Sequence, residues 1–269
     1  PEVNIKTGGV SMQTAVRKTI KPEKPVPAVR KAASPVLDDS LKLVAAWDKT
    51  AVRELAMKDP RVRKMLESIG IDTCCGGGMK LKAAAEAACV KQEKIADAVR
   101  RALAGAEIPE ENESVWIKRS DRELILHIVK VYHKYLHENM PQFEIWFNRV
   151  IKAHGAHAKE LKQVFGFYKS FMADMIPHLR KEEEVVFPAI LSGGTTAMEL
   201  RRLIRELEAE HTNVGNLLKE IGTITFNYRI PVYACPTMQM LYNGLREMDV
   251  QTREHIYLEN NILFPRVII

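Results

Sequence analysis

Cysteine is scarce in this chain, with four among 269 residues, and two of the four form the adjacent pair Cys74 and Cys75. Adjacent cysteines do not join distant elements in the usual way, so the disulfide framework of a small secreted protein is excluded. The chain has no run of about 18 uninterrupted apolar residues, and it does not open on an apolar segment with a small-residue cleavage site. These absences predict a protein of the reducing cytoplasm without a membrane partner.

Aromatic residues are also few, at 7% of the chain, whereas Ala, Leu, Lys, Arg and Glu are abundant. This composition favours helices over sheets. The length of 269 residues exceeds what one small domain needs. We therefore predict an all-α protein in which a small N-terminal helical domain, residues 45–106, is joined by a linker, residues 107–119, to an up-and-down four-helix bundle, residues 120–269.

The net charge of +6 is concentrated at the start of the chain. Residues 1–37 contain seven basic and two acidic side chains, and Pro22, Pro25 and Pro27 fall in the same stretch. Because it has no helical or alternating pattern, this stretch predicts a disordered basic leader or linker over residues 1–44. A nucleic-acid partner is not expected, since the rest of the chain is nearly neutral. The prolines also disfavour a mitochondrial-type targeting peptide.

Short helices are predicted between residues 50 and 104. Thr50 can cap a first helix, Pro60 can open a second, and Gly70 can end it. The loop IDTCCGGG follows and ends just before another helix.

That loop places two thiols ahead of a helix N-terminus among basic residues, and both features lower the pKa of a thiol. Two interpretations of Cys74 and Cys75 stay open: they are catalytic or metal-binding thiols, or a small apolar pair packed under the glycines. Cys89 and Cys235 stand alone in the sequence, and we predict that they are core residues.

Four long helical patterns make up the predicted bundle. The first begins at a capping box formed by Ser120 and Glu123. The patterns cover about residues 120–152, 158–190, 196–222 and 236–264, with mostly short connections. Such bundles hold their metal and cofactor sites between facing helices.

An internal repeat lies within this region. The segments HLRKEEEVVFP, residues 178–188, and HIYLENNILFP, residues 255–265, share the pattern H-x3-E-x4-F-P at an offset of 77 residues. A second pair of histidines, His133 and His211, lies upstream at an offset of 78 residues. Each half of the bundle is therefore predicted to be one helical hairpin that carries two histidines and one glutamate.

The repeated residue types predict a metal centre. Residues four apart lie on one face of a helix, so each H-x3-E pair can point at one ion. Four imidazoles and two carboxylates do not suit structural zinc, calcium or magnesium, and iron fits best, followed by manganese. We predict two iron ions, each held by two histidines, with both glutamates and an oxo or hydroxo group as bridges. The predicted ligands are His133, His178, Glu182, His211, His255 and Glu259.

Other polar residues beside these ligands are not predicted to bind the metal themselves. His137 lies one turn after His133 and is predicted to contact the ligands from outside. Glu183, Glu184 and Glu210 are predicted to belong to a solvated helix face.

Three groups of residues resemble one known family. GIDTCCGGG resembles the short N-terminal ScdA-type domain, YHKYLHENMP resembles the first ligand segment, and HLRKEEEVVFP, EAEHTN and HIYLENNILFP resemble the remainder of a haemerythrin-like domain. Over roughly residues 45–267 the chain is thus similar to the repair-of-iron-centres family, the ScdA/YtfE group of di-iron proteins. The resemblance implies the same six ligands. It also implies a cytoplasmic stress-response protein that restores iron-sulfur clusters damaged by nitric oxide or peroxide.

Several functions share these ligands and stay open at the level of sequence. The first is iron donation to damaged iron-sulfur proteins or to a cluster scaffold, aided by the two thiols. The second is a di-iron nitric oxide reductase, which needs an electron donor that the sequence does not identify. The third is haemerythrin-like binding or sensing of oxygen or nitric oxide. A homodimer formed through the cysteine-bearing domain is a further hypothesis.

Overall fold

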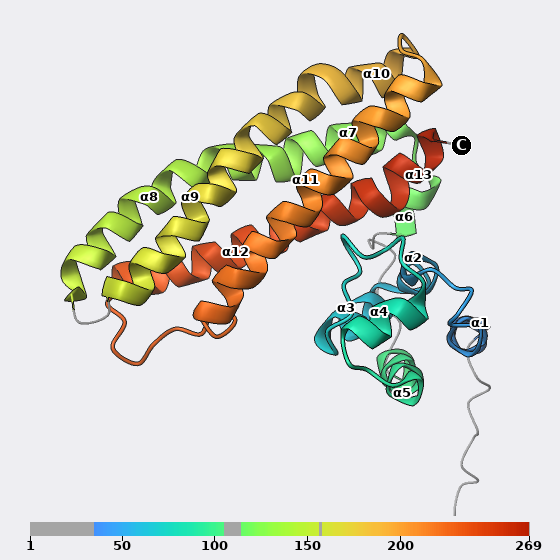
Figure 1. Cartoon of the computed structure of the whole chain (residues 1–269), viewed down its shortest axis with the longest axis horizontal. Coiled ribbons are helices and arrows are strands. Elements are labelled where there is room, and N and C mark those ends of the chain that lie inside the picture. The colour runs from blue at the N-terminus through green and yellow to red at the C-terminus, as the bar shows by residue number, and fades with distance from the viewer. Residues whose placement is uncertain (1–34, 105–113, 156–157, 269) are drawn as a thin grey trace, which may run out of the picture. The chain divides into compact units, whose positions relative to one another are not determined.

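The computed structural model describes residues 35–104, 114–155 and 158–268. In this part of the chain the elements are helices joined by loops, apart from one isolated bridge between Ala51 and Lys80 (Figure 1). The all-α prediction is therefore confirmed. None of the described helices is long and apolar enough to cross a membrane. Most of the predicted basic leader, residues 1–34, lies outside the described residues.

The first helix begins inside the predicted leader. Helix α1, Pro35–Ala45, packs against α5, Gln92–Leu103. Its apolar side chains recur at helical spacing, so that Val44 is buried and Leu37 and Leu41 pack against the core. The prediction of disorder up to residue 44 is wrong for this stretch, because the excess of basic residues ends at Lys31 and Pro35 is the first residue of the helix, where proline is tolerated. A short helix, α6, Ser114–Lys118, likewise occupies part of the predicted linker.

Three further helices complete the N-terminal part: α2, Val52–Ala56; α3, Pro60–Ser68; and α4, Leu81–Ala87. Pro60 opens α3 as predicted, directly after the capping side chain of Asp59. Thr50 does not cap α2. Its hydroxyl instead donates to the carbonyl groups of Leu43 and Ala46, each at 3.0 Å, so it closes the end of α1.

The bundle has the four predicted helices, and Ser120 and Glu123 form the predicted capping box. Helix α8 packs beside α9 and α12, and α11 packs beside α9 and α12, which gives an up-and-down arrangement (Figure 1). The helices are α7, Asp121–His127, continued by α8, Lys134–Ala153; α9, Ala158–Lys181, continued by α10, Phe187–Ser192; α11, Ala197–Ile224; and α12, Pro236–Leu258, continued by α13, Phe264–Val267.

Three of the four bundle helices contain a π-helical segment. The segments are η1, Ile128–His133; η3, Glu182–Val186; and η4, Glu259–Leu263. Each begins or ends at one of the predicted metal ligands. A π segment widens one turn of a helix, and such segments are frequent at functional sites. The widened turns therefore mark the level of the bundle at which the ligands lie.

The interior of the bundle is apolar and aromatic toward the turn between α8 and α9. Phe147 packs on Tyr168 with ring centroids 5.3 Å apart, and on Phe165 at 4.8 Å. The Tyr168 hydroxyl is satisfied by the carbonyl oxygen of Met140. Each buried aromatic ring of this size contributes about 3–5 kcal/mol relative to alanine. This apolar end holds the helices together independently of the polar residues further along.

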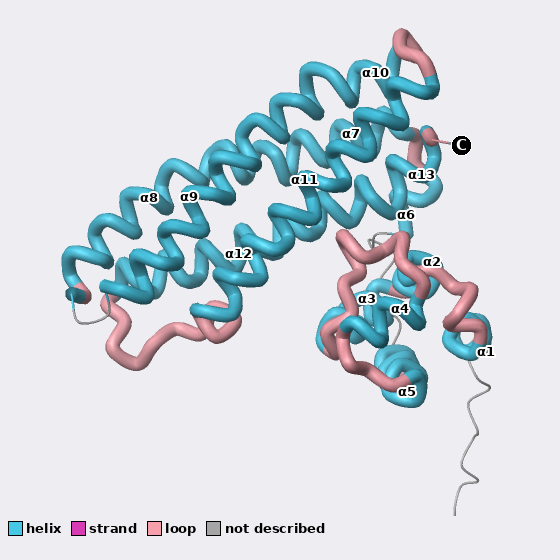
Figure 2. The backbone as a smooth tube through the Cα atoms, in the orientation of Figure 1, coloured by secondary structure: helices cyan, strands magenta, loops and turns pink. Residues whose placement is uncertain are grey.

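The loop between α3 and α4 carries the cysteine pair and packs closely on η4; it is one of the pink segments of Figure 2. The Asn261 amide donates to the carbonyl oxygens of Thr73 and Cys74, at 3.2 and 3.4 Å. A Cβ added at Gly77 would lie 1.8 Å from the Asn261 side-chain oxygen. The glycine is therefore required for close approach between loop and helix.

We expect Gly77→Ala to lower the free energy of unfolding by about 1–3 kcal/mol, because the added methyl group overpacks this contact. The measurement is urea unfolding followed by circular dichroism. Gly166→Ala in α9 is the matched control. Nothing lies within 4 Å of a Cβ at Gly166, so that variant should be stabilised by up to ~1 kcal/mol through helix propensity. Equal unfolding curves for the two variants would contradict the packing account.

Candidate metal centre

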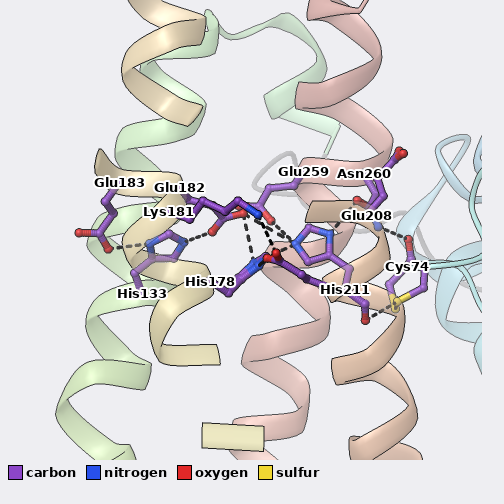
Figure 3. A network of polar contacts seen from close by, with 12 residues as sticks. Cys74, His133, His178, Lys181, Glu182, Glu183, Glu208, His211, Glu259 and Asn260 are labelled. Atoms are coloured by element: carbon purple, nitrogen blue, oxygen red, sulfur yellow. Dashed lines mark hydrogen bonds and ion pairs between the residues drawn. The ribbon is translucent and has the colours of Figure 1, made fainter. Parts of the chain in front are cut away.

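Six polar side chains lie inside the bundle at the level of the π-helical segments, and Figure 3 shows how five of them converge. They are the six predicted ligands, His133 of η1, His178 of α9, Glu182 of η3, His211 of α11, His255 of α12 and Glu259 of η4, and none is more than 2% exposed. Burying ionisable groups in this number is costly unless they are paired or bind an ion.

The distances between these groups are short. The two oxygens of Glu182 lie 3.2 Å from His178 Nε2 and 3.4 Å from His133 Nε2. His211 Nε2 lies 3.1 Å from His178 Nε2 and 3.3 Å from an oxygen of Glu259. Two overlapping sets therefore have ligand atoms within 4.8 Å of one another: His178, His211, His255 and Glu259 in one, and His133, Glu182 and Glu259 in the other.

Several of the converging atoms have no hydrogen-bond partner among the described residues. They include both carboxylate oxygens of Glu182 and of Glu259, both ring nitrogens of His255, and Nε2 of His133. Buried polar atoms in folded proteins are nearly always hydrogen-bonded. A cation placed among them would satisfy these oxygens and nitrogens together, so the residues present fit a metal site.

Three of the histidines form a hydrogen bond with a polar side chain through Nδ1, the ring nitrogen that faces away from the centre. His133 Nδ1 pairs with Glu183 and His178 Nδ1 with Glu210, each at 2.8 Å, while His211 Nδ1 pairs with the side-chain oxygen of Asn260 at 2.9 Å. Such a contact fixes the tautomer, so that Nε2 faces the interior as a ligand. No such partner is found for His255 in the described part of the chain.

The sequence-based interpretation of Glu183 and Glu210 as residues of a solvated face describes only part of their role, since about a third of each side chain is exposed and each also contacts a predicted ligand. The remaining two thirds are covered, because each carboxylate leans onto a histidine of a neighbouring helix. The internal repeat contained a signal for one of these contacts. Glu183 and Asn260 each directly follow the repeated glutamate, and each backs the upstream histidine of its own hairpin.

Charges around Glu210 strengthen its contact with His178. The hydrogen bond from His178, and then that from Lys181 at 2.7 Å, lower the Glu210 pKa to about 2 in spite of partial burial. Lys181 also lies 3.3 Å from Glu206. On the other side of the centre, His137 Nε2 lies 3.6 Å from Glu183, the residue that supports His133, and about half of the His137 side chain is exposed.

The buried groups perturb one another's ionisation. Burial holds the pKa of His255 well below its usual value, so this imidazole is neutral, as a metal ligand must be. Burial and then the charge of Glu182 raise the pKa of Glu259. Burial also acts to raise the pKa of Glu182, but the interactions with His178, His211 and His133 together outweigh it and lower this pKa well below the usual value. A bound cation would compete with protons for all of these groups.

The cysteine pair lies outside this set but touches it. Cys74 Sγ is 3.6 Å from Cys75 Sγ, and Cys75 Sγ donates to the carbonyl oxygen of His211 at 3.4 Å. The hydrogen bond with Cys74 lowers the pKa of Cys75, whereas this bond and burial raise that of Cys74. Only one thiol of the pair is therefore activated.

The two remaining cysteines were predicted to lie in the core. Cys89 is exposed instead, at a positive φ of 55° directly after α4, where the chain turns toward α5. Cys235 is partly buried and is the residue before α12. The turn geometry, which the sequence pattern does not show, keeps Cys89 out of the core.

Comparison with known proteins gives matches over both parts of the chain. The family model described as the hemerythrin HHE cation binding domain matches residues 124–267. A second model, ScdA_N, described as a domain of unknown function, matches residues 48–103. Both matched segments lie largely within the described residues.

Similar curated proteins carry the name iron-sulfur cluster repair protein YtfE. The proteins of Citrobacter koseri and Escherichia coli O81 are each 34% identical to this chain, and that of Enterobacter sp. strain 638 is 33% identical. Each similarity runs over 217 residues, which is 80% of this chain and 94% of the relative.

Proposed function

Because the chain belongs to the hemerythrin HHE cation-binding family, and within it to the family of the iron-sulfur cluster repair proteins YtfE, we propose that it is a di-iron protein that repairs iron-sulfur clusters. Its action is to donate iron to proteins whose clusters were damaged by nitrosative or oxidative stress, and it also binds or reduces nitric oxide. The observation that carries the proposal is the set of six buried ligand groups, several of which have no hydrogen-bond partner among the described residues.

The two ions are assigned to ligands from the distances between side chains. The Nε2 atoms of His178 and His211 lie 3.1 Å apart, close enough for one ion to take both as ligands. We assign this pair to one ion. His133 and His255, whose rings meet edge to face at 5.6 Å, are assigned to the other.

Both glutamates are assigned as bridges, since each reaches histidines of both pairs. Glu182 lies near His133 and His178, and Glu259 belongs to both overlapping ligand sets. Bound iron supplies an exchangeable position for a small ligand and a change of oxidation state. The chain's own residues hold the imidazoles in the tautomer that binds metal and keep bulk water away from the carboxylates.

A surface pocket of about 300 Å³ lies next to the centre, and His178, Lys181 and Glu210 are among its lining residues. The side chain of His178 is itself fully covered, so the ring and its Glu210 partner separate this pocket from the other ligands. A ligand set of nitrogen and oxygen without thiolate holds iron less firmly than a cluster site does. This donor set favours exchange of an ion over permanent storage.

The test is metal analysis with an absorption spectrum of the purified protein, before and after nitric oxide is added to the reduced form. We expect about two iron ions per chain, an oxo-bridge absorption and a nitrosyl signal. The iron-loaded protein should then restore the activity of a dehydratase whose cluster was damaged by nitric oxide, and the metal-free protein should not. One zinc ion per chain, or repair without iron loading, would overturn the proposal.

A further inference from the structure

The loop between α3 and α4 contains a second cluster of groups that bind metals. Asp72, Cys74 and Cys75 have ligand atoms within 4.8 Å of one another, and none of them belongs to the six ligands of the bundle. Cys74 Sγ lies 3.6 Å from Cys75 Sγ and 3.3 Å from an oxygen of Asp72. Cys74 is buried, Cys75 is partly exposed and Asp72 is exposed, so the cluster spans the distance from protein interior to surface.

The spacing of the two sulfur atoms suits one ion. Thiolates bound at about 2.3 Å to a tetrahedral ion lie roughly 3.8 Å apart, close to the distance found. The loop is also held in this conformation, because the Asp72 oxygen accepts hydrogen bonds from the backbone N–H groups of Cys74 and Cys75, at 2.9 and 3.0 Å. Three ligands leave a position free, which is typical of sites that exchange or react rather than of closed structural sites.

A cation lies against the inner sulfur atom of the cluster. The Arg253 guanidinium lies 3.9 Å from Cys74 Sγ and is itself held by Asp249 at 2.6 Å. A positive group beside a thiol favours the thiolate, which is the form that binds metal. The cluster therefore has a charge partner when no ion is bound.

The cluster lies between solvent and the buried centre. On its outer side is a pocket of about 350 Å³ lined by Asp72, Cys75 and Arg253 among others. One water occupies about 30 Å³ of liquid, so a hydrated divalent ion fits there. On its inner side, Cys75 contacts the backbone carbonyl oxygen of His211. Asn260 connects the same two segments: its side-chain nitrogen donates to the Cys74 carbonyl oxygen at 3.2 Å, and its side-chain oxygen accepts from the His211 ring.

We propose that Asp72, Cys74 and Cys75 form an accessory site for ferrous iron, through which an ion leaving the bundle passes on its way to an acceptor. This inference rests on the proposed function, in which iron is the cargo. Binding exchanges the thiol protons for the ion and releases them to solvent, and no electron is transferred.

The accessory site is tested with cobalt(II) as the probe, because thiolate ligation gives an intense charge-transfer absorption that histidine and carboxylate ligands lack. The reduced, metal-free full-length chain is titrated without oxygen. We expect the charge-transfer band to develop with about one more cobalt ion per chain than the bundle holds. The variant Cys74→Ser, Cys75→Ser should lose the band and that ion. A wild-type protein without the band, or a double variant that keeps it, would overturn the proposal.

Two variants refine the result. Cys89→Ser with Cys235→Ser should leave the band unchanged, since neither residue belongs to the cluster. Gly215→Ala places a methyl group 3.1 Å from Cys75 Sγ and should weaken cobalt binding at the thiols several-fold without removing a ligand. If cobalt binds in the bundle but not at the thiols, the accessory site is contradicted and the proposed function stands. Cobalt at the thiols alone supports the accessory site and overturns the di-iron centre.

Discussion

Glu259→Gln is expected to lose at least one of the two iron ions and with it most of the stabilisation that iron gives. The substitution keeps the size of the side chain but removes a negative charge that both predicted ions share. Metal bound at about 100 times its dissociation constant stabilises a protein by about 2.7 kcal/mol. Comparing the free energy of unfolding with and without iron should therefore show a loss of roughly this size in the variant.

The metal-free form of the same variant should be as stable as the metal-free wild type, or more stable. Burial and the charge of Glu182 raise the pKa of Glu259, so its ionised form is unfavourable when no cation is present. Glu184→Gln is the control, since this neighbour of Glu182 is exposed. Iron content equal to that of the wild type in Glu259→Gln would contradict the assignment of Glu259 as a bridging ligand.

Glu210→Gln is expected to weaken iron binding by about 10–100-fold, the usual effect of changing a group that supports a metal-binding histidine. Glutamine can still accept the hydrogen bond from His178, but it no longer increases the electron density on the ring. The measurement is competition for ferrous iron with a chelator of known affinity.

Glu206→Gln provides a matched control for that experiment. Glu206 and Glu210 both pair with Lys181, at 3.3 and 2.7 Å, but it is Glu210 that accepts the hydrogen bond from His178. The control should bind iron as the wild type does. If Glu206→Gln and Glu210→Gln weaken iron binding equally, the loss comes from the ion pairs with Lys181 and not from the hydrogen bond that His178 donates.

The bundle and its candidate ligands could be predicted from the sequence because both depend on short-range periodicity. Histidine and glutamate four residues apart lie on one helix face whatever the rest of the fold does. The repeat then placed His178 and Glu182 in correspondence with His255 and Glu259, and the structure brings all four into the bundle interior. The helix boundaries followed from glycine, proline and capping residues.

The supporting residues could not be predicted in the same way. Glu183 is one position after Glu182, about 100° further around an ideal helix, so the periodicity suggests that it faces solvent. It actually contacts a histidine on another helix, within a π-helical turn that changes the helical spacing. The docking of the cysteine loop on Asn260 was equally hidden, because the two segments are 186 residues apart and no local pattern links them.

The two hairpins correspond in sequence but differ at one informative position. Glu183 in the first hairpin matches Asn260 in the second, and each supports the upstream histidine of its own hairpin. Because Asn260 has an amide group, it also donates to the Cys74 carbonyl oxygen, which an ionised carboxylate has no proton to do. A single side chain of the second hairpin therefore connects a predicted ligand to the cysteine loop.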